Sequence, residues 1–283
     1  MELTSAVICC GFQKCATTSL WQYLVSSNSF SYFEAKERDY FGSNEENKFN
    51  AIERDEFFRF VSHELLDVSP QYACSKAAEH IYRAEFDSIK ILFICRDPID
   101  RIISQVQQNI RRGSTINFEL ESLSSELDAL ISKYGKSTNV PIVKTITYDH
   151  INSSVVLNSC YTSVVNHYAK LFGEDNIHIF SMDNILSKPS TLHQVLGIST
   201  EKLDKFPKKN SGGSERYGVI KSLSKVGVVK GFVKYLLGKR LYQKLWWWVN
   251  TELLIDDSKK IKIDIDPLVL KKLEDFFIDE IRA

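Results

Sequence analysis

Several features that mark particular classes of protein are missing from this chain of 283 residues. It has no apolar run of about 18 residues, so no segment is long enough to cross a membrane as a helix. Its first residues carry neither a basic start nor a long apolar stretch, which argues against a secretory signal peptide. The chain also has no internal repeat and no low-complexity tract.

An excess of positive charge is missing too. Lys and Arg together number 36, as do Asp and Glu, so the net charge is zero. Proteins that bind nucleic acid usually carry a basic excess, and the balance here gives no support to such a partner. Hydrophobic residues make up 43% of the chain, which is enough for a sizeable core and argues against disorder.

The cysteines lack the spacing of a metal site. None of the six forms a C-x-x-C pair, and several lie in apolar, strand-like runs. We therefore expect no bound metal, and we expect buried, reduced thiols in a cytoplasmic protein. The residues concerned are Cys9, Cys10, Cys15, Cys74, Cys95 and Cys160.

Apolar patterning predicts alternating strands and helices. Residues 6–10 read as a strand that is followed by a loop and a helix over 18–25. Residues 90–95 form a continuous apolar run, typical of a buried parallel strand. Pro98 suits the first turn of a helix that runs to about residue 112. This alternation predicts an α/β fold with a P-loop-like central parallel sheet flanked by helices.

Three further segments complete the predicted core. Residues 49–65 show helical spacing of apolar side chains, and residues 158–172 read as a helix that stops at Gly173. Residues 177–180 read as a short strand. We expect one domain, with the α/β core in residues 1–215 and a helical subdomain in residues 216–283.

The predicted subdomain contains a basic stretch. Residues 219–250 hold seven Lys and Arg and no acidic residue, between Lys221 and Lys244, and Trp246–Trp248 follow. One interpretation is a surface for an anionic acceptor, a membrane or a partner. The other is a solvated helix face that packs on the core through its aromatic side chains.

The first loop has the features of a phosphate site. Residues 11–20, GFQKCATTSL, join the first strand to the first helix, where unpaired backbone N–H groups favour an anion. The loop is not a Walker A motif, because Lys14 precedes the hydroxyls and no Gly-Lys-Ser/Thr ends it. The simpler alternative is an ordinary helix N-terminus with hydroxyl caps. The residues expected to hold a phosphate are Gln13, Lys14, Cys15, Ala16, Thr17, Thr18 and Ser19.

A second anion site is predicted after the strand over 90–95. Arg96 stands where open α/β sheets bind ligands, and Ser104 follows about two helical turns later. Both could converge on one phosphate, which a guanidinium binds in bidentate fashion. The alternative is that Arg96 forms a structural ion pair with Asp97 or Asp100.

Together these two elements resemble the sulfotransferases that use 3′-phosphoadenosine 5′-phosphosulfate (PAPS). Residues 11–19 are similar to that family's G-x-x-K-x-G-T-T/S loop, with Ala16 in place of the usual glycine. Residues 96–104 match the family's R-D-P-x-x-R-x-x-S at every defined position. The resemblance implies that the first motif binds the 5′-phosphosulfate and the second the 3′-phosphate.

Weaker matches follow in the expected order. Residues 36–41, KERDYF, resemble the K-E-x-x-F-F segment of heparan-sulfate-type sulfotransferases, which implies that Glu37 is the catalytic base beside Lys36. Ser69 and Tyr72 lie in an S-P-x-Y turn that the resemblance sets near cofactor and acceptor. The resemblance implies that Lys36, Ser69 and Tyr72 bind the acceptor substrate. A glycine-containing loop that closes over the nucleotide corresponds to Lys209, Asn210, Ser211 and Gly212.

The resulting hypothesis is transfer of a sulfuryl group from PAPS to a hydroxyl or amine of a sugar or small polar natural product. Lys14 stabilises the leaving phosphate and Glu37 removes the acceptor's proton. Some sulfotransferases use a histidine base, so His63, His80, His150 and His167 are rivals, although each also reads as an ordinary helix or loop residue.

Two other functions stay open. An atypical P-loop kinase would depend on ATP and magnesium, and a catalytically silent nucleotide-binding scaffold would bind the bisphosphate product without turnover. The sequence does not identify the acceptor.

Overall fold

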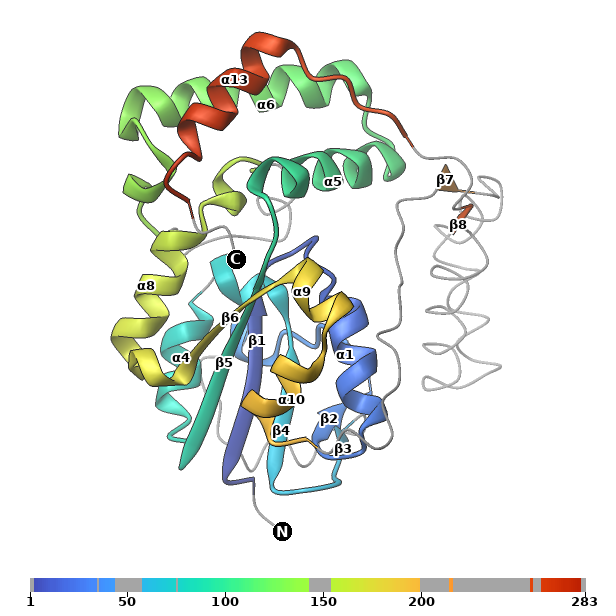
Figure 1. Ribbon diagram of the computed structural model, residues 1–283, viewed down its shortest axis with the longest axis vertical. Coiled ribbons are helices and arrows are strands. Elements are labelled where there is room, and N and C mark those ends of the chain that lie inside the picture. Colours follow the sequence, from blue (N-terminus) through green and yellow to red (C-terminus); the bar gives the residue numbers. More distant parts are fainter. Residues whose placement is uncertain are drawn as a thin grey trace.

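The computed structural model describes residues 3–34, 36–43, 58–74, 76–142, 154–198, 214–215, 255–256 and 261–280. Its centre is a six-stranded sheet of order β3-β2-β4-β1-β5-β6, in which only β3 runs antiparallel to its neighbour (Figure 1). The strands are β1 (Ser5–Gly11), β2 (Ser31–Phe33), β3 (Phe58–Arg59), β4 (Glu64–Val68), β5 (Ser88–Cys95) and β6 (Ile177–Ser181). The predicted α/β fold with a mostly parallel central sheet is confirmed.

The middle strands form the core because they are apolar along their whole buried length. In β1 every residue after Ser5 is buried, and the last five residues of β5 are buried as well. β1 lies between β4 and β5, and the chain fills one side of β1 before it crosses to the other. Open parallel sheets bind ligands at such a switch point, beyond the carboxyl ends of the strands.

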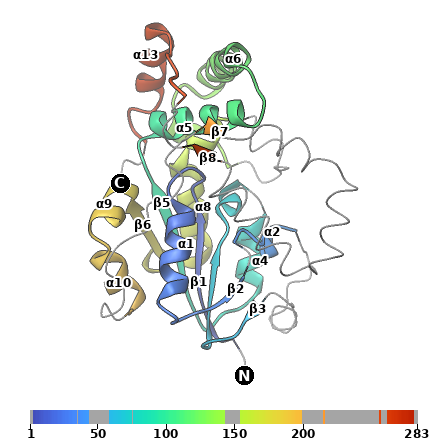
Figure 2. The ribbon, with the colours of Figure 1, turned by 90° about the vertical axis from the view of Figure 1, so that its right-hand side faces the viewer.

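Helices cover both faces of the sheet. On one face lie α1 (Thr17–Ser26), α9 (Met182–Ser187) and α10 (Ser190–Leu196), and the first and last of these are joined by Tyr23 and His193 at 2.6 Å (Figure 2). The other face carries α4 (Ala77–Arg83) and α8 (Tyr161–Phe172) (Figures 1 and 2). The short α2 (Tyr40–Ser43) packs near α4.

A second helical layer lies over the carboxyl ends of the strands. It consists of α5 (Pro98–Arg111), α6 (Ile116–Tyr134) and α13 (Pro267–Phe276), with its own buried cluster that includes Ile102, Leu123 and Phe276 (Figure 1). Asp97 fixes where α5 begins, because its carboxylate accepts from the amides of Ile99 and Asp100 at 2.9 and 3.1 Å. The start of α5 is thereby held directly above the end of β5.

Short elements complete the described chain. Four 3₁₀ helices are η1 (Pro70–Cys74), η2 (Ser137–Asn139), η3 (Leu157–Ser159) and η4 (Glu174–Asn176). A separate antiparallel pair joins β7 (Ser214–Glu215) and β8 (Ile255–Asp256). The predicted helical subdomain at 216–283 falls mostly outside the described residues, as do the basic stretch and Trp246–Trp248.

The helix predicted over residues 49–65 is wrong where the structure describes it. Phe58 and Arg59 form edge strand β3, and Glu64 begins β4, which pairs in parallel with β1 from Ser5 onward. Two of the apolar residues that suggested a helical stripe, Phe60 and Val61, lie in the connection between β3 and β4, and Val61 is 39% exposed. The pairing of β3 and of β4 within the sheet therefore overrides the local period. Among the described residues, none of the helices has the length and apolar character needed to cross a membrane.

Candidate functional site

The loop after β1 bends sharply into the first turn of α1. Lys14 and Ala16 both have left-handed backbone conformations, with φ values of 68° and 58°, and Ala16 is the N-cap residue of the helix. Thr17 and Ser19 are buried in the first turn, at 5% and 1% exposure. The N–H groups at a helix N-terminus and the helix dipole favour an anion beside this loop.

Arg96 brings the second predicted motif to this loop. Its Nη1 donates to the backbone carbonyl of Lys14 at 3.4 Å, and its Nε is buried without a hydrogen-bond partner among the described residues. Nη2 lies 3.2 Å from the carboxylate of Asp100. The ion pair that the alternative interpretation predicted is therefore present with Asp100, while Asp97 serves as the helix cap.

Ser104 lies on α5, two turns beyond the start of the helix, and is half-buried. It shares that helix with Arg101, whose side chain is fully buried, and with Arg111 and Arg112 near the helix end. The sequence motif contains Arg101, but no role was predicted for it. Its contacts with the loop are a finding of the structure.

Positive charge converges on Lys14. Burial is the main cause that lowers the pKa of its ammonium to about 7, and repulsion from Arg111, Arg101 and Arg112 lowers it further. Glu37 acts in the opposite direction. An anion beside Lys14 would reverse this destabilisation, as expected of a phosphate or sulfate site.

The segment from Lys36 lies against the same loop. The ammonium of Lys36 donates to the carboxylate of Glu37 and lies 3.5 Å from Oγ1 of Thr17. The side chain of Lys36 is 7% exposed and that of Glu37 is 44% exposed. Lys36 therefore joins the predicted base to the first turn of α1.

Behind this segment lies a buried hydroxyl–carboxylate network. Asp67 accepts from Ser69 Oγ and from the Tyr72 hydroxyl, both at 2.7 Å. The Tyr72 hydroxyl in turn accepts from the amide of Phe41 at 3.0 Å. Ser69 and Tyr72 were predicted to contact the acceptor, yet both are 0% exposed and their hydroxyls face Asp67.

Two carboxyl groups in this region were not singled out from the sequence. Burial raises the pKa of Asp67, and its two hydroxyl donors act against that rise. Burial also raises the pKa of Asp39 to about 6, with repulsion from Asp67 as the next cause. The buried position of Asp67 gives no signal in the sequence, because no strand was predicted over residues 64–68.

The rival histidines occupy other environments. His80 is buried and its Nδ1 lies 2.7 Å from the carbonyl of Phe41, while His167 lies 3.3 Å from Glu79. The ring of His63 packs edge-on against Phe60. His150 lies outside the described residues, as do Lys209, Asn210, Ser211 and Gly212.

Five cysteines are buried and form no disulfide: Cys9, Cys10, Cys15, Cys95 and Cys160. Burial raises the pKa of Cys15 to about 11, so its thiol is protonated although it lies in the phosphate loop. Among the residues that the structure describes, no group of three His, Cys, Asp or Glu side chains is arranged to hold a metal ion.

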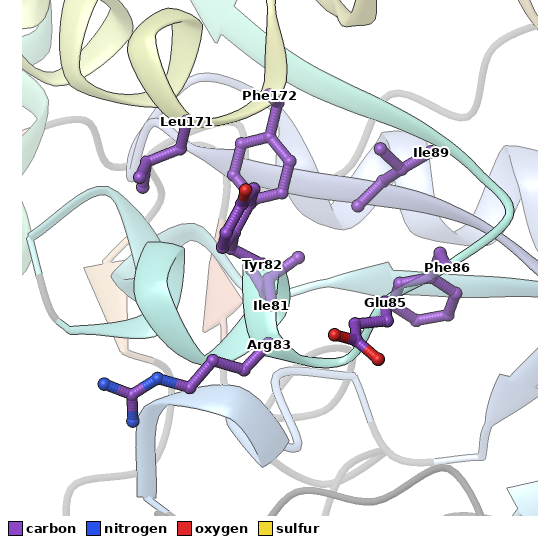
Figure 3. Close-up of a pocket in the computed structure, with 8 residues that line it drawn as sticks. All are labelled: Ile81, Tyr82, Arg83, Glu85, Phe86, Ile89, Leu171 and Phe172. Atoms are coloured by element: carbon purple, nitrogen blue, oxygen red, sulfur yellow. The ribbon is translucent and has the colours of Figure 1, made fainter.

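A cavity of about 530 Å³ lies at the opposite end of the sheet (Figure 3). It is lined by Tyr82 and Arg83 from α4, Ile89 near the start of β5, and Phe172 at the end of α8. Arg96 follows the other end of β5. This cavity, which Arg83 and Glu85 line together with apolar side chains, is therefore separate from the phosphate loop.

Comparison with solved structures supports the fold. The crystal structure of a sulfotransferase from Alicyclobacillus acidocaldarius is 20% identical, covers 72% of this chain and 85% of its own, and superposes with a TM-score of 0.52. A sulfotransferase domain from the curacin biosynthetic pathway is 14% identical, covers 71% of this chain and 76% of its own, and has a TM-score of 0.42. No curated protein matches the chain by sequence.

The family assignment rests on the sequence of the core. Residues 1–172 match the model of the sulfotransferase family, which is more than half of the chain. The matched part includes the phosphate loop, the segment around Glu37 and the whole of α5. The chain belongs to the sulfotransferase family.

Proposed function

We propose that this chain transfers a sulfuryl group from PAPS to a hydroxyl or amine of a sugar or small polar natural product. The observation that carries the proposal is the contact between Arg96 and the carbonyl of Lys14. It brings together two anion-binding motifs that are 82 residues apart in the chain. A nucleotide with phosphates at both its 3′ and 5′ positions fits such a pair.

The chemistry of the donor set fits PAPS. Thr17, Thr18 and Ser19 offer hydroxyls at the N-terminus of α1, together with backbone amides, for the 5′-phosphate. Arg96 and Ser104 would hold the 3′-phosphate. The Nε of Arg96 is buried and has no hydrogen-bond acceptor among the described residues, and a phosphate oxygen would provide one. Lys209 to Gly212 remain predicted contributors.

Lys14 would stabilise negative charge during the transfer. PAPS supplies the sulfuryl group and a leaving phosphate on which charge grows. An ammonium held in a partly buried loop interacts more strongly with that growing charge than it would in water. With a pKa of about 7, Lys14 is only partly protonated at neutral pH in the free loop, and a bound anion would favour its charged form.

Glu37 would take the proton of the acceptor. Its carboxylate is 44% exposed, so an acceptor can reach it from solvent. Lys36 pairs with it and also approaches Thr17, which sets the base beside the 5′-phosphate end of the site. Ser69 and Tyr72 would act behind it, because they hold Asp67 and the amide of Phe41 instead of touching the acceptor.

The decisive experiment is a transfer screen with radiolabelled PAPS against sugars, amines and phenols. Sulfated product is the expected result for at least one acceptor. Calorimetry then compares adenosine 3′,5′-bisphosphate with 5′-AMP, and we expect clear preference for the bisphosphate. Preference for the bisphosphate without sulfate transfer to any acceptor would favour the silent scaffold. Binding of ATP with magnesium, and of neither adenosine 3′,5′-bisphosphate nor 5′-AMP, would favour the kinase. Cytoplasmic location and the lack of a nucleic acid partner stay predictions.

A further inference from the structure

Arg101 connects the phosphate loop to a distant part of the chain. Its Nε donates to the backbone carbonyl of Gln13 at 3.3 Å. Its Nη1 donates to the carbonyl of Val155 at 2.8 Å and lies 3.5 Å from Oγ of Ser159. Because a guanidinium is planar and rigid, these bonds fix the loop relative to the segment that leads into η3.

The bond to Gln13 also orients Lys14. The peptide group between them is trans, so its C=O and N–H point in opposite directions within one plane. Arg101 holds the carbonyl on the buried side of the loop. The N–H of Lys14 is therefore directed away from the buried guanidinium, toward the opposite side of the loop.

A second arginine holds the next peptide group. Arg96, just before α5, donates to the carbonyl of Lys14. Arg101, within α5, donates to the carbonyl of Gln13. Each of the two peptide groups that flank the Lys14 Cα is therefore held by one arginine. Lys14 has a φ of 68°, a conformation that costs a residue with a side chain about 1 kcal/mol or more. The two hydrogen bonds hold the loop in this unfavourable conformation.

Arg101 forms no direct ion pair among the described residues, although its charge acts on the carboxylate of Glu126 and lowers the pKa that burial raises there. The side chain of Arg101 is 0% exposed, and within the described parts of the chain no carboxylate lies within ion-pair distance of it. Its Nη2 is buried without a hydrogen-bond partner there. A buried guanidinium without a direct ion pair and with one unpartnered nitrogen is costly. A phosphate in the loop would add negative charge near it.

The cavity beside Arg101 that the described residues form is too small for a phosphate. The cavity that Arg101 lines together with Gln13, Gln71 and Asn158 leaves 10 Å³ to the centre of a water molecule. That space admits about one water and no phosphate group. The contacts through which Arg101 acts on the loop are its hydrogen bonds to Gln13 and Val155.

We propose that Arg101 is a positioning residue for the 5′-phosphate of the donor nucleotide. Through the Gln13 carbonyl it sets the direction of the Lys14 N–H and side chain, and its charge adds to the attraction for the phosphate. This inference rests on the proposed function.

The test compares two nucleotides that differ only in the group concerned. Adenosine 3′,5′-bisphosphate carries the 5′-phosphate, and adenosine 3′-monophosphate lacks it. Calorimetry gives the ratio of their affinities for wild type, Arg101→Met and Arg101→Lys. We expect Arg101→Met to reduce this ratio about tenfold or more while the affinity for the 3′-monophosphate is unchanged. With PAPS we expect kcat to fall about 100-fold.

Arg101→Lys keeps the charge but cannot hold both carbonyls at once, so we expect a smaller loss of the ratio. If Arg101→Met does not fold, the affinity ratio of Arg101→Lys alone tests the inference. The matched control is Arg83→Met, since Arg83 is exposed and lies at the far end of the sheet.

The pH dependence of bisphosphate binding distinguishes a positioning role of Arg101 from a general loss of structure. Repulsion from Arg101 is one of the causes that lower the pKa of Lys14, so loss of that charge should move the midpoint of the bisphosphate-binding profile to higher pH. Arg101→Lys should leave the midpoint in place. Equal losses for both nucleotides, or an unchanged affinity ratio in both variants, would overturn the inference. If wild type itself does not prefer the bisphosphate, the proposed function fails instead.

Discussion

Arg96 donates a hydrogen bond of 3.4 Å to the backbone carbonyl of Lys14. The contact exists because β1 and β5 are parallel neighbours, with Gly11 of one paired to Phe93 of the other. The residues that follow the two strands therefore meet above the same edge of the sheet. Arg96 reaches Lys14 with one terminal nitrogen and Asp100 with the other, which leads to a first prediction.

Replacing Asp100 by Asn should strengthen binding of adenosine 3′,5′-bisphosphate. The Asp100 carboxylate lies 3.2 Å from Arg96 Nη2 and competes with a 3′-phosphate for it, and its side chain is 61% exposed. Exposed ion pairs contribute about 0.2–1 kcal/mol, so we expect a gain in affinity of up to about fivefold by calorimetry. The affinity for 5′-AMP, which lacks the 3′-phosphate, should not change. Weaker binding of the bisphosphate would mean that Asp100 orients Arg96 instead of competing for it.

Glu37→Gln should remove turnover and spare nucleotide binding. Loss of a general base lowers kcat by about 100-fold or more, whereas the amide keeps the shape of the side chain. Radiolabelled transfer measures kcat, and calorimetry with the bisphosphate measures binding. The control is Glu34→Gln, a carboxylate that pairs with Arg59 at the edge of the sheet. Transfer at the wild-type rate by Glu37→Gln would eliminate this residue as the base.

Tyr72→Phe tests whether the buried network positions the segment around Glu37. The substitution removes a donor to Asp67 and an acceptor for the amide of Phe41, both buried. Leaving these groups unsatisfied should lower the free energy of unfolding by about 1–3 kcal/mol. We also expect a lower kcat with unchanged bisphosphate affinity. Tyr82→Phe is the matched control, because Tyr82 is 56% exposed, and a drop in stability with normal kcat would leave Tyr72 a purely structural role.

Local sequence signals predicted the elements that carry the phosphate motifs. The apolar run at 90–95 became β5, Pro98 stands in the first turn of α5, and Gly173 ends α8 with a φ of 83°. These signals succeed because a buried strand, a proline at a helix start and a glycine at a helix end each have a local physical cause.

What the sequence could not predict depends on contacts between distant segments. Asp67 lies near the end of β4, a strand that was not predicted, and its partners become apparent only once the sheet is assembled. Arg101 belongs to a motif visible in the sequence, yet its bonds to Gln13 and Val155 join residues 88 and 54 positions away. Periodicity carries no information about such pairings.

Ala16→Gly should stabilise the protein. Ala16 has a φ of 58°, and a left-handed conformation costs alanine about 1 kcal/mol more than glycine. Because glycine also gains entropy in the unfolded chain, we expect a net gain of about 0.5 kcal/mol in urea unfolding. Ala169→Gly, within α8, is the control and should lose about 1 kcal/mol. A loss at both positions would contradict the strain at Ala16.

Lys14→Met should change how both stability and binding depend on pH. The pKa of Lys14 is about 7 in the folded protein, below its ordinary value of 10.5. Between these values the unfolded chain binds one proton more than the folded one, so the free energy of unfolding rises with pH through this group. Allowing for partial exposure, we expect wild type to gain about 1–2 kcal/mol between pH 7.5 and 9.5 relative to Lys14→Met.

Binding should show the opposite trend, because a phosphate needs Lys14 charged. Affinity for the bisphosphate should fall by up to about tenfold per pH unit above pH 7 in wild type, and should stay nearly flat in Lys14→Met. Urea unfolding and calorimetry over this range measure the two trends. Lys170→Met, an exposed position on α8, should follow wild type in both. If wild type and Lys14→Met bound the bisphosphate with the same pH profile, Lys14 would not be the cation that meets the 5′-phosphate, because its charge would then have no part in the affinity.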